Sequence, residues 1–182
     1  YELGQPTHCF NRDSVNSKFT LENKKTSCTF KTLLGTEINL AGKNCVFSMN
    51  DEIISLAGVM GGALTEVDSN TKNIVIECAT FDMYTVRKTS MRFGLFTDAV
   101  TRFNKGQSPL QNDRVMSYLI KSMSDQAGAV QASDVYDLRN GIDFVYIDQS
   151  ISGSISVTAD FINNRLGSNL GETEICGLLQ NV

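Results

Sequence analysis

Two ionisable side chains in this sequence lie where their surroundings suit chemistry. His8 is the only histidine of the chain and follows the turn-forming pair Gln5 and Pro6. Glu77 lies in an expected strand at residues 73–78, among apolar neighbours. A carboxylate there either reaches solvent at a sheet edge or meets a partner in a pocket, because burying an unpaired carboxylate is costly. An imidazole that titrates near neutral pH suits acid–base work, although a lone histidine more often has a structural role.

Two further blocks combine small and hydroxyl-bearing residues. The segment LAGVMGG occupies residues 56–62, and Thr97 opens the triplet that ends at Ala99. Glycine permits a turn with positive φ or a close approach of a ligand, and Gly61 suits either. Thr97 and Asp98 are also common helix caps. The residues alone therefore leave a structural and a binding role open for both blocks.

Basic side chains gather in one part of an otherwise acidic chain. The formal net charge is −4, which argues against nucleic-acid binding through the overall field but leaves room for a local patch. Such a cluster is either a solvated helix face or a contact for phosphate groups. Its members are Arg87, Lys88, Arg92, Arg102 and Lys105.

The cysteine pattern excludes some classes of site. The five cysteines are scattered, and no two of them have the spacing of metal ligands. We therefore expect no zinc site, and an odd number of thiols in a chain of this size argues against a disulfide framework. Free thiols, together with the lack of a long apolar run or an opening signal peptide, predict a cytoplasmic protein.

Short alternating apolar and polar runs fill residues 17–57. They predict several short strands, with Asn50 and Asp51 as a hairpin turn, and thus a strand-rich, barrel-like part. Helical signals follow: residues 82–93 between an Asp82 cap and Gly94, then residues 98–105, then a longer helix from Ser108 to about Gly128.

Beyond this helix the pattern changes twice. Residues 130–138 and 144–147 are expected to return as strands, and helices are expected near residues 158–166 and 172–179. The fold class is therefore α+β, with a boundary near Asp148 that separates residues 1–148 from a truncated helical domain at residues 149–182. The chain begins at Tyr1 without methionine and ends inside a helical pattern, which predicts a piece of a larger subunit.

Five blocks of sequence resemble one known family. They are ELGQPTHCF at residues 2–10, LAGVMGG at 56–62, IVIECATFD at 74–82, VRKTS at 86–90 and GLFTDAVTRFNKG at 94–106. Together they resemble the editing module of the beta subunit of bacterial-type phenylalanyl-tRNA synthetase, and five blocks in register are far more specific than any one of them. The resemblance implies hydrolysis of mischarged tyrosyl-tRNA(Phe), within a parent enzyme that attaches phenylalanine to its tRNA with ATP.

The resemblance also implies residue roles. Glu77 would recognise the phenolic hydroxyl of a tyrosyl group, Gly61 would form the pocket floor, and Thr97 and Ala99 would line its other side. His8 would lie near the ester, where it holds the terminal adenosine of the tRNA or orients the attacking water. We expect backbone N–H groups around Gly61 and Gly62 to stabilise the oxyanion. Arg87, Lys88 and Arg92 would contact tRNA phosphates.

The expected partners and cofactors follow from the same resemblance. The module would bind the acceptor end of tRNA(Phe), and the rest of the beta chain would bind the alpha subunit, with no membrane involved. No cofactor or metal is expected within this region, since ATP and Mg²⁺ would bind elsewhere in the parent enzyme. Two alternatives stay open: a catalytically inactive RNA-docking or scaffold module of the same fold, and a free-standing editing protein.

Overall fold

A computed structural model describes residues 2–15, 18–138 and 156–180. The chain divides into two compact units, Tyr1–Ala132 and Ser133–Val182. The expected boundary near Asp148 and the expected strand at residues 144–147 lie outside the described residues, so both stay predictions.

The larger unit contains a four-stranded antiparallel sheet in the order β2-β3-β4-β5. Its strands are β2 (Phe19–Lys31), β3 (Glu37–Met49), β4 (Glu52–Leu56) and β5 (Met60–Gly61). The sequence predicts several short strands here, whereas the structure joins them into two strands of 13 residues each. The polar residues around Lys24 do not interrupt the hairpin, because their backbones stay paired in register with β3.

The turn between β3 and β4 confirms the expected hairpin at Asn50 and Asp51. Both residues have positive φ, 49° and 66°, and Met49 pairs directly with Glu52. Positive φ at both central residues matches the twist of the flanking strands, which is why asparagine and aspartate are favoured there.

A separate two-stranded ribbon joins segments far apart in sequence. It pairs β1 (His8–Asn11) with β6 (Ile74–Glu77) in antiparallel register. Cross-strand partners in such a ribbon project from the same face. His8 is the register partner of Glu77, so the ribbon places these two side chains next to each other.

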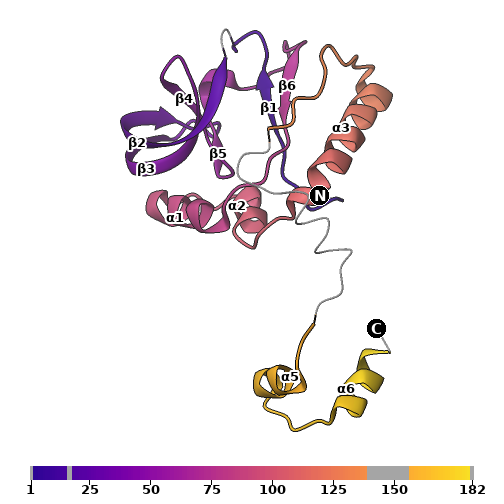
Figure 1. Cartoon of the computed structure of the whole chain (residues 1–182). Coiled ribbons are helices and arrows are strands. Elements are labelled where there is room, and N and C mark those ends of the chain that lie inside the picture. Colours follow the sequence, from indigo (N-terminus) through magenta and orange to yellow (C-terminus); the bar gives the residue numbers. More distant parts are fainter. Residues whose placement is uncertain (1, 16–17, 139–155, 181–182) are drawn as a thin grey trace. The chain divides into compact units, whose positions relative to one another are not determined.

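Three helices complete this unit. The first two are α1 (Met83–Phe93) and α2 (Asp98–Phe103), which run below the four-stranded sheet in Figure 1, and α3 (Asn112–Ala127) lies beside the ribbon. Their caps agree with the sequence. The Asp82 carboxylate accepts a hydrogen bond from Thr85 N, and Gly94 ends α1 at φ 66°.

The remaining helix boundaries differ in detail. The α2 helix ends at Phe103, two residues before the expected end, with Asn104 as its C-cap. Ser108 caps a 3₁₀ turn, Pro109–Gln111, that leads into α3, and Gly128 ends α3 in the left-handed region.

The expected strand at residues 130–138 is wrong. These residues form no strand, and Val130, Tyr136 and Leu138 are all more than 80% exposed. Alternating apolar residues become a strand only when a neighbouring strand satisfies their backbone groups, and no described strand pairs with this segment.

The described part of the smaller unit contains two short helices, as the sequence predicts. They are α5 (Ala159–Leu166), capped by Thr158, and α6 (Glu172–Leu179). Asn163 fixes the turn between them, since its Oδ1 accepts hydrogen bonds from Leu170 N at 2.8 Å and Ser168 Oγ at 2.9 Å.

The core of the larger unit lies between the sheet, the ribbon and the first two helices. Its fully buried side chains include Phe10, Val46, Ile54, Leu56 and Val86. The fold class is α+β, as predicted, and within the described residues the sheet stays open instead of closing into a barrel. Among those residues no helix is long and apolar enough to cross a membrane.

We predict that Gly58→Ala destabilises the larger unit by about 2–4 kcal/mol. Gly58 has φ 69°, and an added Cβ would lie 2.7 Å from Phe81 Cδ2 and 3.1 Å from Val86 Cγ2. The substitution therefore combines backbone strain with overpacking. Urea denaturation followed by circular dichroism measures the loss.

Gly94→Ala is the matched control for this prediction. Gly94 has nearly the same φ, 66°, but an added Cβ would have nothing within 4 Å. It should cost about 1–2 kcal/mol, from backbone strain alone. Equal losses in the two variants would show that the close packing at Gly58 contributes nothing.

Candidate functional site

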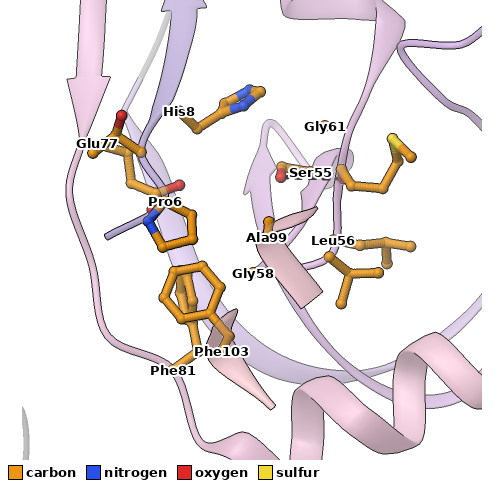
Figure 2. A pocket seen from close by; sticks show the side chains of 13 residues that line it. Pro6, His8, Ser55, Leu56, Gly58, Gly61, Glu77, Phe81, Ala99 and Phe103 are labelled. Atoms are coloured by element: carbon orange, nitrogen blue, oxygen red, sulfur yellow. Dashed lines mark hydrogen bonds between the residues drawn. The ribbon is translucent and has the colours of Figure 1, made fainter. Parts of the chain in front are cut away.

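A small hollow of about 70 Å³ opens where the β1–β6 ribbon faces β4, β5 and the start of α2. Figure 2 shows His8 and Glu77 on the ribbon side, Ser55 and Gly61 on the sheet side, and two phenylalanine rings at the base. The lining residues are Pro6, Thr7, His8, Ser55, Leu56, Gly58, Val59, Met60, Gly61, Glu77, Phe81, Ala99 and Phe103.

The His8 imidazole lies against the wall in a largely apolar setting. Its ring meets the Phe10 ring edge-on, with centroids 4.4 Å apart, and its Nε2 is buried without a hydrogen-bond partner. Burial lowers the pKa of His8 below its ordinary value, which favours the neutral imidazole at neutral pH. A neutral ring can accept or donate one hydrogen bond at each nitrogen according to its tautomer.

The Glu77 carboxylate faces the same hollow. Burial raises the pKa of Glu77 to about 7, because removal from water disfavours the charged form. No described residue donates a hydrogen bond to this carboxylate, and the residue keeps some exposure through the hollow. A largely buried acid without a protein partner is a group to which a ligand hydroxyl can donate.

Gly61 is needed in the site because it has no side chain, and not because of its backbone conformation. It lies in β5 and does not have the positive φ that a turn would require. An added Cβ would lie 2.5 Å from His8 Cε1 and 2.7 Å from Leu33 Cδ1. Glycine at this position therefore lets the imidazole lie flat against the sheet.

Gly62 lies behind this wall and does not line the hollow. Its N–H donates to Ile54 O at 2.9 Å, and an added Cβ would come within 2.7 Å of the same oxygen. This N–H is therefore not available to an oxyanion, so the expectation for the glycine pair does not hold for Gly62.

The structure separates the roles of Thr97 and Ala99. Ala99 lines the hollow, whereas Thr97 does not. The Thr97 hydroxyl caps α2 by accepting from Val100 N at 3.2 Å, and it donates to Val59 O at 2.9 Å. Thr97 thus ties α2 to the glycine-rich segment and so positions Ala99.

The three basic residues expected to contact RNA lie outside the hollow. Arg92 is engaged within the fold, since its Nη1 donates to Ala41 O at 3.1 Å and to Lys43 O at 3.3 Å. These bonds fasten the last turn of α1 to β3. Arg87 and Lys88 are exposed on α1 and form no salt bridge with any described residue.

Comparison with known proteins identifies the family of the part of the chain that forms the hollow. The model of the B3/4 domain family matches residues 1–128, which include every residue that lines the hollow.

The chain belongs to the B3/4 domain family.

Curated relatives of this B3/4 domain are named phenylalanine–tRNA ligase beta subunit. The protein of Fusobacterium nucleatum subsp. nucleatum is 30% identical over 179 residues, which cover 98% of this chain and 22% of the relative. That of Streptococcus thermophilus is 34% identical over 183 residues (95% and 21%), and that of Bacillus cereus is 32% identical over 182 residues (100% and 22%). The chain thus spans about a fifth of the length of these relatives. The resemblance of its sequence blocks to the beta subunit of phenylalanyl-tRNA synthetase is confirmed.

The sequence alone did not single out Ser55, which lines the hollow of this B3/4 domain, or Gln5, which supports it. Ser55 is buried in the wall, 4% exposed, between Ile54 and Leu56. A polar residue inside an apolar strand is the signal that singled out Glu77, and it applies equally to Ser55. Gln5 is buried below the ribbon, where its Nε2 donates to Ala79 O at 2.7 Å and its Oε1 accepts from Gln111 Nε2 at 2.6 Å.

The Gln5 bonds explain how the B3/4 domain holds its site together. They connect the residue that leads into β1 with the segment after β6 and with the turn before α3. The end of the ribbon that carries His8 and Glu77 is thereby held in place. Among the described residues, no three His, Cys, Asp or Glu side chains lie together in a way that could bind a metal ion.

We predict that Glu77→Gln raises the free energy of unfolding of this domain at pH 8 by roughly 1–3 kcal/mol. The native pKa of about 7 exceeds the reference value of 4.5. Between these values the native state binds more protons than the unfolded state, so the stability of the parent protein falls as pH rises. Glutamine cannot ionise, and the variant should lack this slope.

Urea denaturation at pH 4, 6 and 8 provides the test. Glu52→Gln is the control for loss of one negative charge, because Glu52 is exposed at the start of β4. If Glu77→Gln raised the free energy of unfolding equally at pH 4 and pH 8, the result would contradict a buried Glu77 carboxylate that ionises between these pH values.

Proposed function

We propose that this domain hydrolyses tyrosyl-tRNA(Phe) as the editing module of a phenylalanine–tRNA ligase beta subunit. The observation that carries the proposal is the Glu77 carboxylate, which faces a hollow and has no hydrogen-bond partner among the described residues. The names of the curated relatives supply the synthetase context, and the hollow supplies a reason for a second, proofreading site.

The chemical need for such a site follows from the two amino acids. Tyrosine adds a single hydroxyl to phenylalanine, and a synthetic pocket rejects an added hydroxyl by only about 100-fold. A second site that forms a hydrogen bond with that hydroxyl favours the tyrosyl group over the phenylalanyl group. A phenylalanyl ring in the hollow would leave the Glu77 carboxylate desolvated and unpaired, which costs on the order of a few kcal/mol.

The walls suit an aromatic side chain that ends in a hydroxyl. Phe81 and Phe103 lie at the base with ring centroids 5.1 Å apart, and Gly61 and Ala99 add no bulk. Apolar walls with one acidic group favour a ring that presents a donor to Glu77.

The hydrolytic step requires a water molecule and the ester carbonyl. The water oxygen bonds to the carbonyl carbon, and the C–O bond to the terminal ribose then breaks. The proton lost by water ends on the ribose oxygen, so tyrosine and intact tRNA are released. Neutral His8, on the same ribbon face as Glu77, is the side chain that we assign to orient this water or the terminal adenosine.

The wider assembly belongs to the same proposal. The acceptor end would approach the hollow, with Arg87 and Lys88 exposed on α1 as contacts for phosphates. Arg92 is the weaker member of that set, because its guanidinium already bonds to backbone carbonyls of β3. The alpha subunit, ATP and Mg²⁺ would engage other parts of the synthetase in the cytoplasm.

Glu77→Ala should lower the ratio of tyrosyl to phenylalanyl ester deacylation by about 10- to 100-fold. This range corresponds to about 1.5–3 kcal/mol for a hydrogen bond to a charged group. Deacylation of both esters by the complete synthetase is the measurement. Because an ionised carboxylate is the stronger acceptor, the preference of the parent enzyme should also rise as pH passes through about 7, and the variant should show no such rise.

His8→Ala is the companion variant and should behave differently. It should slow cleavage of both esters with little change in their ratio, because His8 is assigned to the ester end of the site. If Glu77→Ala slows both esters equally and keeps the ratio, Glu77 does not read the hydroxyl. If neither variant changes deacylation, the inactive docking module is the better description.

Gly61→Ala should impair deacylation of both esters by tenfold or more while phenylalanine charging stays unchanged. The added methyl would displace the His8 ring, because its position is only 2.5 Å from His8 Cε1. Gly171→Ala, whose added Cβ meets nothing within 4 Å, is the control outside the hollow. An equal fall in charging and deacylation would mark Gly61 as a structural position only.

A further inference from the structure

The wall of the hollow contains a buried hydroxyl with no assigned role. Ser55 is 4% exposed and lies in β4. Its backbone register partner is Gly61, the residue against which the His8 ring rests. Ser55 therefore lies on the His8 side of the hollow, and Figure 2 shows its side chain directed toward the space between His8 and Ala99.

The Ser55 hydroxyl is only weakly engaged in the fold. Its one hydrogen bond is to Met60 O, at 3.4 Å, whereas hydroxyl donors usually lie 2.7–2.8 Å from their acceptors. A hydroxyl proton rotates freely about the C–O bond, so a closer acceptor in the hollow would capture it. A developing oxyanion is such an acceptor, since hydrogen bonds to charged oxygen are roughly twice as strong as neutral ones.

Two backbone donors near the hollow are already committed. Gly62 N donates to Ile54 O and Val59 N donates to Leu56 O, both at 2.9 Å. The hydroxyl of Thr7, another lining residue, belongs to an exposed side chain. Ser55 combines burial, a free rotor and a position beside the His8 wall, which are the properties required of an oxyanion donor.

We propose that the Ser55 hydroxyl donates a hydrogen bond to the carbonyl oxygen of the tyrosyl ester as that oxygen becomes an oxyanion. Water adds to the carbonyl carbon, the carbonyl π electrons move onto the oxygen, and Ser55 turns from Met60 O to this oxygen. Ser55 keeps its proton throughout, and its hydrogen bond returns to Met60 O when the ribose oxygen leaves. The inference rests on the proposed hydrolysis of tyrosyl-tRNA(Phe) and adds a catalytic residue to it.

The test uses Ser55→Ala and Ser55→Cys in the complete synthetase, with tyrosyl-tRNA(Phe) and phenylalanyl-tRNA(Phe) as substrates. We expect kcat for deacylation of both esters to fall on the order of 100-fold in Ser55→Ala, as for loss of one oxyanion donor. KM and the ratio between the esters should stay within about twofold. Ser55→Cys should be intermediate, because a thiol is a weaker donor.

A pair of analogues distinguishes transition-state contact from structural support. Tyrosyl-3′-aminoadenosine carries a stable amide that mimics the ground state, and the matching phosphonate mimics the tetrahedral oxyanion. Ser55→Ala should weaken phosphonate binding by about the same factor as kcat and leave amide binding unchanged. Thr65→Val is the control, because the Thr65 hydroxyl is also buried but Thr65 does not line the hollow.

Each remaining outcome overturns the assignment. Deacylation by Ser55→Ala within threefold of the parent rate shows that the hydroxyl is not an oxyanion donor. Equal weakening of the two analogues, in either Ser55 variant, shows a structural role only. If the parent synthetase deacylates neither ester, the proposed function fails and this inference fails with it, whereas an active parent with an unaffected Ser55→Ala leaves the proposed function standing.

Discussion

His8 and Glu77 face each other because β1 and β6 pair in a single register. Side chains alternate between the two faces of a strand, so a slip of one residue would turn either group away from the hollow and bring Cys9 or Cys78 in its place. A ribbon of four residues per strand is weak by itself. Gln5 therefore supports its register, because the Gln5 amide bonds at 2.7 Å and 2.6 Å connect the His8–Glu77 end of the ribbon to the turn before α3.

A continuous line of aromatic rings extends this constraint into the core. Starting at His8, the rings of Phe10, Phe47, Phe81 and Phe103 meet edge to face, with successive centroids 4.4 to 6.2 Å apart. This arrangement is the favourable one for aromatic quadrupoles. The line begins and ends at lining residues of the hollow, so the two sides of the site share one packed support.

Local chemistry made much of this architecture predictable. The Asp82 and Gly94 caps, the Asn50–Asp51 turn and the α3 helix all follow from preferences that act within a few residues. Residues 130–138 show the limit, because their alternation resembles a strand while the pairing partner that a strand needs is a non-local fact. Arg92 shows the same limit, because the residues next to it in the sequence do not indicate that its guanidinium would bond to backbone carbonyls of β3.

The prediction of the candidate site has the same limit. The sequence singled out His8, Glu77, Gly61 and Ala99, and the structure brings all four to one hollow. Thr97 and Gly62 were expected there as well, but both are one layer behind it, where they support the wall through bonds to Val59 O and Ile54 O. Distinguishing a lining residue from its immediate support requires side-chain directions, which spacing alone does not contain.

Three glycines of the segment 56–62 leave this wall almost no freedom to vary. At Gly58, Gly61 and Gly62 even a methyl group would come within 2.7 Å of a neighbouring atom, so no single substitution can enlarge a side chain there without moving a neighbouring residue. Evolution toward a different ligand must therefore act on other lining residues. Ala99 is small, lines the same hollow and belongs to another element, α2, which makes it the position where a change of substrate can begin.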